Sequence, residues 1–215
     1  VLSRSGGWGF GRKTSFYTIF GLMLAVAALY PLTATSAKWD IRMSDDAPTT
    51  LDGMAFMETA TYEDSGQTIS LKPDYDALQW MQRHIDGSPV VAEAYSGNYY
   101  RSVGNRVAMY TGLPTIIGWA GHQGQQRAAV PDARIQERVF DVEQLYNTID
   151  TNHAQFIIEK YDVSYIYVGP LERTYYTQLG LQKFKQMMAD GLIESVYNHN
   201  EVIIYRVLET AQASN

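Results

Sequence analysis

The residues best suited to ligand binding lie in the central part of the chain, around two short apolar runs. The candidates are Glu93, Tyr99, Tyr100, Arg106, Trp119, His122, Gln123 and Arg127. Tryptophan and tyrosine offer flat faces for stacking, whereas arginine, glutamine and glutamate form directed hydrogen bonds. If these side chains meet at the carboxyl edge of a sheet, they form a site for a sugar or an anionic head group. The alternative is structural: Trp119 fills the core and the arginines pair with acidic residues from the helices.

Other kinds of chemistry find less support in the sequence. The chain has no cysteine, and its histidines (His84, His122, His153 and His199) are far apart, with no second ligand at helix or strand spacing. No G-x-S-x-G nucleophile motif occurs, and the glycine-rich segment 118–124 lacks the spacing of a phosphate or dinucleotide loop. We therefore expect no metal site, no cofactor and no catalytic residue in this chain.

The N-terminal part of the chain has the composition of a membrane anchor. Residues 14–37 carry no charge, and about 17–25 apolar residues are needed to cross a bilayer. Tyr17 and Tyr30 lie near the two ends, where interfacial aromatic residues are common, and we expect Pro31 to end the helix. Alternatives are a buried core helix or a cleaved signal peptide, because ATSA before Lys38 resembles a cleavage site. Since the sequence still carries residues 1–37, we prefer a retained anchor.

The distribution of charge orients this anchor. Residues 1–35 contain Arg4, Arg12 and Lys13 and no acidic residue, whereas residues 36–215 have a net charge of −9. The positive end is expected in the cytoplasm, so the rest of the chain would lie on the extracytoplasmic (periplasmic) side of the cell membrane in a single-pass topology. The acidic body disfavours nucleic acid as a partner, because phosphate binding needs clustered Lys and Arg.

After the anchor, alternating apolar and polar segments predict an α/β fold: one N-terminal transmembrane helix followed by an extracytoplasmic mixed-sheet α/β domain. We expect a hairpin around Asp64-Ser65-Gly66, helices at 74–85, 141–149, 152–161 and 175–189, strands at 90–94, 107–110, 115–119, 163–168, 192–197 and 202–207, and a polar connector at 120–138. The expected organisation is a basic cytoplasmic tail (1–13), the transmembrane helix (14–37), a loop and hairpin linker (38–73), the α/β domain (74–208) and a C-terminal tail (209–215).

Several motifs resemble one family of membrane proteins. They are TLDG at 50–53, D-x-x-A-L-x-W at 74–80, V-V-x-E-A at 90–94, RVAMYTGLPTIIGW-x-GHQ at 106–123, LYNTID at 145–150 and YDVSYIYVGPLER at 161–173. From about Phe16 onward the chain resembles the C-terminal end of the Chlor-Arch YYY membrane proteins, and the run from Tyr110 to His122 is the most specific part of the likeness. That family is multi-span and similar to GT-C-type, lipid-linked sugar transferases. The resemblance implies that further membrane spans precede this region in the family and that the catalytic carboxylates lie on early extracytoplasmic loops. This sequence contains neither.

Two functions follow from the sequence. In the first, the chain is a membrane-anchored, non-catalytic accessory subunit or domain, whose partners are the lipid bilayer and other membrane protein subunits, for example of a respiratory or photosynthetic complex. In the second, it is the C-terminal soluble domain of a GT-C-like lipid-linked glycosyltransferase. Trp119, His122 and Arg127 would then lie near the head group of a lipid-linked sugar.

Overall fold

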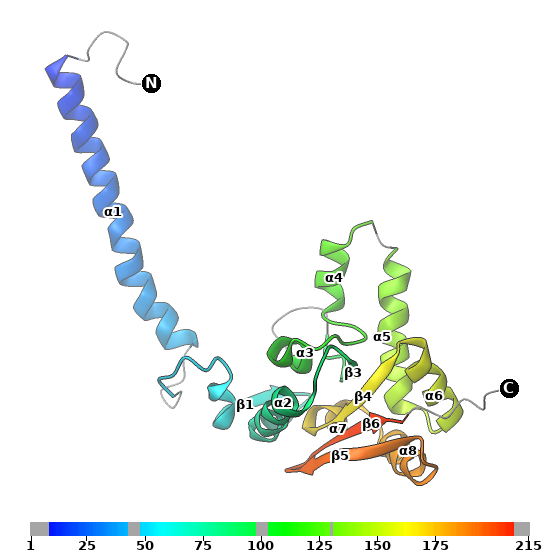
Figure 1. The fold of residues 1–215 in the computed structure, drawn as a ribbon. Coiled ribbons are helices and arrows are strands. Elements are labelled where there is room, and N and C mark those ends of the chain that lie inside the picture. The colour runs from blue at the N-terminus through cyan, green and yellow to red at the C-terminus, as the bar shows by residue number, and fades with distance from the viewer. Residues whose placement is uncertain (1–8, 43–47, 98–102, 130, 209–215) are drawn as a thin grey trace. The chain divides into compact units, whose positions relative to one another are not determined.

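The computed structural model describes residues 9–42, 48–97, 103–129 and 131–208. Two compact units divide the chain, Val1–Thr49 and Thr50–Asn215. The first contains a single long helix, and the second contains the sheets and the remaining helices (Figure 1).

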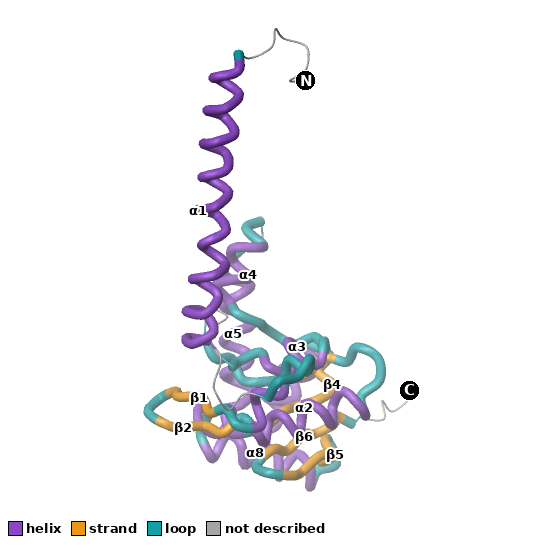
Figure 2. Tube along the Cα trace, turned by 90° about the vertical axis from the view of Figure 1, so that its left-hand side faces the viewer, coloured by secondary structure: helices purple, strands orange, loops and turns teal. Residues whose placement is uncertain are grey.

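Helix α1 (Phe10–Arg42) has 33 residues, none of them buried, and its most apolar window has a mean hydropathy of 1.7. At about 1.5 Å per residue it measures about 50 Å, so by length and composition it is able to cross a membrane. It exceeds the expected range of 14–37 at both ends, and residues 10–13, expected in the tail, are helical. The expectation that Pro31 ends the helix is wrong, since α1 runs through it without a break (Figure 2). After Pro31, the Thr33 hydroxyl donates to the Leu29 carbonyl and the Ser36 hydroxyl donates to the Thr33 carbonyl.

The second unit is built on a mixed four-stranded sheet, as the sequence predicts. Its order is β3 (Val90–Ala92), β4 (Val163–Val168), β6 (Val202–Val207) and β5 (Ile193–His199). Strands β3 and β4 are parallel, whereas β4–β6 and β6–β5 are antiparallel. The expected hairpin between β5 and β6 is therefore confirmed.

Helices cover both faces of this sheet. Successive strand residues point to opposite faces, so they contribute to two separate hydrophobic cores. Ile166 and Tyr205 belong to the core on the face covered by α5 (Asp132–Asn147), α6 (Thr151–Lys160) and α8 (Gln178–Ala189). Tyr167 and Ile204 belong to the core on the face covered by α2 (Lys72–His84), α3 (Arg106–Thr111) and the short 3-10 helix η1 (Ala55–Glu58). The result is a three-layer α/β/α arrangement.

The compact unit begins at Thr50, earlier than the expected boundary at residue 74. Strands β1 (Thr61–Asp64) and β2 (Gln67–Ser70) form the expected hairpin, which Figure 2 shows apart from the four-stranded sheet. Ser65 and Gly66 adopt positive φ in its tight turn, as such turns require. The hairpin belongs to this unit because it buries Ile69 in the core.

The strands expected at 107–110 and 115–119 are not formed. Residues 107–110 lie in α3, which begins where the Glu93 carboxylate accepts hydrogen bonds from the Val107 and Ala108 amides. It ends at Gly112, which has a φ of 76°. In the second segment, Thr115 forms an isolated parallel bridge with Val91. Both runs are apolar because part of each is buried, which makes them resemble strands in sequence. Neither run forms a β-ladder in the structure.

Three helix boundaries also differ from expectation. The connector expected at 120–138 contains α4 (Ala120–Gln126) and the start of α5. The helix expected at 175–189 is split into α7 (Pro170–Tyr175) and α8, with Thr177 capping α8 through its hydroxyl. Helix α6 begins at Thr151, one residue before the expected start, and the Asp150 side chain caps it.

Candidate functional site

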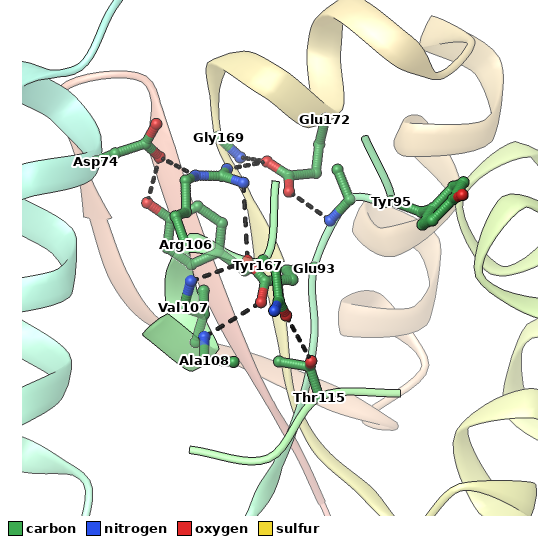
Figure 3. Close-up of polar contacts among 12 residues, drawn as sticks. Asp74, Glu93, Tyr95, Arg106, Val107, Ala108, Thr115, Tyr167, Gly169 and Glu172 are labelled. Carbon is green, nitrogen blue, oxygen red and sulfur yellow. Dashed lines mark hydrogen bonds and ion pairs between the residues drawn. The ribbon is translucent and has the colours of Figure 1, made fainter. Parts of the chain in front are cut away.

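The largest group of charged residues inside the α/β unit surrounds Arg106, at the first position of α3 (Figure 3). Its guanidinium lies 2.7 Å from Glu172 Oε2, 2.9 Å from Asp74 Oδ1 and 3.9 Å from Glu93 Oε2. Its Cζ is 4.8 Å from the ring centroid of Tyr167, whose hydroxyl donates to Asp74 Oδ1 at 2.6 Å. We call these five residues the Arg106 cluster.

Two carboxylates of the cluster, Glu172 and Glu93, also accept hydrogen bonds from backbone amides. Glu172 accepts hydrogen bonds from the amides of Ala94 and Gly169, both at 2.8 Å, and so joins the ends of β3 and β4 to α7. Glu93 caps the start of α3 through the Val107 and Ala108 amides, at 2.9 and 3.2 Å. These bonds explain why the chain can turn at the carboxyl edge of the sheet without leaving buried amides unpaired.

The cluster contains three carboxyl groups and one arginine, all buried. Burial raises the pKa of Glu93 to about 7, although Arg106 and the two amides oppose the shift. Burial also raises the pKa of Asp74, again against the effect of Arg106. A carboxyl group at Glu93 that keeps its proton near neutral pH reduces the uncompensated negative charge in this core.

This geometry suits a structural role better than catalysis. The side chains of Asp74, Arg106 and Glu172 have no exposed surface, so a substrate cannot reach them in this conformation. The structural alternative considered for the sequence is therefore confirmed for Arg106, which pairs with acids from α2 and α7. Asp74, Tyr167 and Glu172 were not among the predicted residues. The signal for Glu172 was its place in the first turn after Gly169-Pro170, where a glutamate often caps backbone amides.

A second group of predicted residues lies at the start of α4 and is partly accessible. Trp119, His122 and Gln123 are half-buried, and the Trp119 and His122 ring centroids are 6.0 Å apart. The indole Nε1 of Trp119 is buried and has no hydrogen-bond partner within the described ranges. We call these three residues the α4 surface.

Gly118 allows this surface to form. A side chain there would come within 3.1 Å of the Asn105 amide and 3.2 Å of the Gln123 amide. Asn105 in turn accepts a hydrogen bond at 3.1 Å from the Thr115 hydroxyl, which links the segment before α4 to the residue preceding Arg106.

The structure thus divides the predicted site residues. Glu93 and Arg106 meet in the buried cluster, whereas Trp119, His122 and Gln123 meet at the α4 surface. Arg127 lies exposed at the other end of α4. Tyr99 and Tyr100 lie outside the described residues. Across residues 9–42, 48–97, 103–129 and 131–208, no group of three or more acidic or histidine side chains has the arrangement of a metal site.

Neither a protein-family model nor a curated protein matches the chain. Among solved structures, it is similar to the C-terminal globular domain of an oligosaccharyltransferase from Archaeoglobus fulgidus. The TM-score is 0.37 and the sequence identity 14%, over 62% of this chain and 95% of that domain. The likeness to the Chlor-Arch YYY proteins stays an expectation from the sequence motifs.

Proposed function

We propose that this chain is a membrane-anchored, non-catalytic binding domain. Helix α1 holds it in a larger membrane protein assembly, and the α/β unit, on the extracytoplasmic side, contacts a partner or ligand through the α4 surface. The observation that carries this proposal is the division of the polar residues: the acid–base groups around Arg106 are buried against each other, whereas the α4 surface is accessible and holds an unpartnered indole N–H.

The α4 surface has the composition of a binding hot spot. Tryptophan is the residue most enriched in such positions, because it combines a large apolar area with one hydrogen-bond donor. A buried donor without an acceptor costs about 1–3 kcal/mol. Because Nε1 is buried in this conformation, an acceptor reaches it only when the Trp119 side chain moves, and a partner that supplies such an acceptor removes this cost.

The experiment is quantitative co-purification of the full chain from its native membrane. Trp119→Phe keeps an aromatic ring but removes the N–H, and Phe156→Ala is a control because Phe156 is an exposed aromatic residue (60%) on α6. We expect the partner recovered per chain to fall roughly tenfold in Trp119→Phe and Trp119→Ala and to stay unchanged in Phe156→Ala. Equal recovery in all four proteins would contradict a role for the α4 surface.

A second candidate function is binding of the sugar head group in a GT-C-like lipid-linked glycosyltransferase. The observation that favours it is that the most specific resemblance motif, 110–122, runs through the α4 surface. In a full-length transferase, replacing Trp119 or Arg127 by alanine would lower sugar transfer from the lipid-linked donor and leave thermal unfolding of the domain unchanged. Unchanged transfer in both variants would remove this candidate.

A further inference from the structure

A pocket of about 320 Å³ lies between the sheet and helices α7 and α8, and it shares no residue with the α4 surface or the Arg106 cluster. Its apolar lining comes from Val168, Leu181 and Ile203. Its polar lining comes from Arg173, Gln178, Gln182, Lys185 and Tyr205. The volume is at the small end of the range of about 300–1,000 Å³ typical of ligand sites.

The charge of this pocket is opposite to that of the rest of the unit. Two basic residues and no acidic residue line it, although residues 36–215 have a net charge of −9. The Arg173 guanidinium is held in place by the Glu201 carbonyl, which accepts from Nε and Nη2 at 3.3 Å each. Its Nη1 is left to donate elsewhere, and a guanidinium fork matches the oxygens of a phosphate group.

Tyr205 provides a second, independent sign of a ligand. It is only 4% exposed, yet within the described part of the chain no hydrogen bond engages its hydroxyl. Its ring packs on Phe184, with centroids 5.7 Å apart, which fixes the side chain at the pocket wall. Although the residue as a whole is buried, its hydroxyl oxygen keeps accessible surface in the lining of the pocket, so it is available to bond to an incoming group.

Helix α8 aligns the remaining polar groups. Gln178, Gln182 and Lys185 are spaced by about one turn and so share one face of the helix. The Thr177 hydroxyl accepts a hydrogen bond from the Gly180 amide, whereas the amides of Gln178 and Leu179, also in the first turn, have no acceptor within the helix. The positive end of the helix dipole and the amide side chains therefore favour an oxygen-rich anion at this end of the pocket.

We propose that this pocket binds a phosphate group that carries a small hydroxylated substituent. Arg173 and Lys185 bind the phosphate oxygens, Tyr205 and the two glutamines bind oxygens of the phosphate or of the substituent, and Leu181 and Ile203 contact its C–H face. A soluble sugar phosphate and a phospholipid head group share this chemistry.

The test uses the full chain in phosphatidylcholine nanodiscs and follows hydrogen exchange of peptides from α7 and α8. The soluble probes are inorganic phosphate and glucose 1-phosphate, with glucose as the probe that lacks phosphate. The lipid probe is the same nanodisc containing phosphatidylglycerol, whose phosphate carries a glycerol. Protection by glucose 1-phosphate but not by glucose supports a soluble ligand, whereas protection only with phosphatidylglycerol supports a lipid ligand.

Three variants connect the protection to the pocket. Arg173→Gln and Lys185→Gln remove one charge each, and Tyr205→Phe removes the hydroxyl while keeping the ring on Phe184. We expect roughly tenfold weaker binding in each charge variant and about threefold weaker binding in Tyr205→Phe. Arg134→Gln, an exposed cation on α5, is the control and leaves binding unchanged. Absence of protection by every phosphate probe, or equal protection in the wild type, Arg173→Gln and Tyr205→Phe, would overturn the proposal.

Discussion

The Arg106 guanidinium lies 2.7 Å from the Glu172 carboxylate, and neither side chain has any exposed surface. This one contact joins α3 to α7, and Glu172 continues it to the ends of β3 and β4 through the Ala94 and Gly169 amides. The carboxyl edge of the parallel strand pair, where α/β proteins commonly bind ligands, is here occupied by the protein's own ion pair.

Removing the positive charge should therefore destabilise the fold. Arg106→Met keeps much of the side-chain volume but leaves the surrounding carboxyl groups without a counter-charge. We expect the free energy of unfolding to fall by about 3–5 kcal/mol, measured by urea denaturation. Arg127→Ala removes an exposed arginine and should change it by less than about 0.5 kcal/mol. Similar losses in the two variants would show that Arg106 does not organise the core.

Tyr167→Phe tests the hydrogen bond to Asp74 separately from the ion pair. The hydroxyl donates at 2.6 Å to a fully buried carboxylate that is also bound to Arg106. We expect a loss of about 1–3 kcal/mol in unfolding free energy, because Asp74 loses a buried partner while the ring stays in place. Tyr165→Phe on the same strand is the control, and an equal loss there would assign the effect to strand packing.

Glu93 should make stability depend on pH. The folded state holds its proton up to a pKa of about 7, whereas the unfolded chain releases it near 4.5. Between these values the folded state binds more protons, so the contribution of Glu93 to the unfolding free energy is fully present below pH 4.5 and is lost as the pH rises through 7. The expected fall is about 3 kcal/mol.

Glu93→Gln should flatten this part of the profile in urea titrations at several pH values. Glu143→Gln, which alters an exposed glutamate on α5, should leave the slope unchanged. A slope that persists in Glu93→Gln would mean that another group holds the proton.

Lys183 should act in the opposite direction at higher pH. It is buried on α8, donates to the Gly180 carbonyl at 2.9 Å, and burial lowers its pKa to about 7. The unfolded chain keeps this proton up to 10.5, so the lysine's destabilising effect is greatest below pH 7 and is relieved between pH 7 and 10.5. Lys183→Met should raise the unfolding free energy by roughly 1–3 kcal/mol below pH 7 and lose this advantage at high pH. A constant difference across this pH range would contradict a buried, titrating lysine.

The sequence predicted the elements whose pattern is local. The apolar run of α1, the tight turn at Ser65-Gly66 and the β5–β6 hairpin depend on nearby residues, and all of them form. The failure at 107–110 has a different cause, because the helix there is started by Glu93, which is 14 residues away from Val107. A carboxylate that caps a helix from a distant segment leaves no signal in the sequence of the helix itself.

The candidate site shows the same distinction. The residue types placed Glu93 and Arg106 in one predicted site. They did not predict that both side chains are buried, because that burial depends on Asp74, Tyr167 and Glu172 from distant segments. The pocket lined by Arg173, Lys185 and Tyr205 was missed for the same reason: its residues come from α7, α8 and β6 and have no common motif.

The most direct test of the proposed function is native mass spectrometry of the protein gently extracted from its membrane. We expect the chain to be recovered in a complex of fixed stoichiometry with at least one other membrane protein, and Trp119→Ala to lower the fraction bound without changing the thermal unfolding of the domain. Recovery of the chain as a free monomer from native membranes would contradict the proposed function.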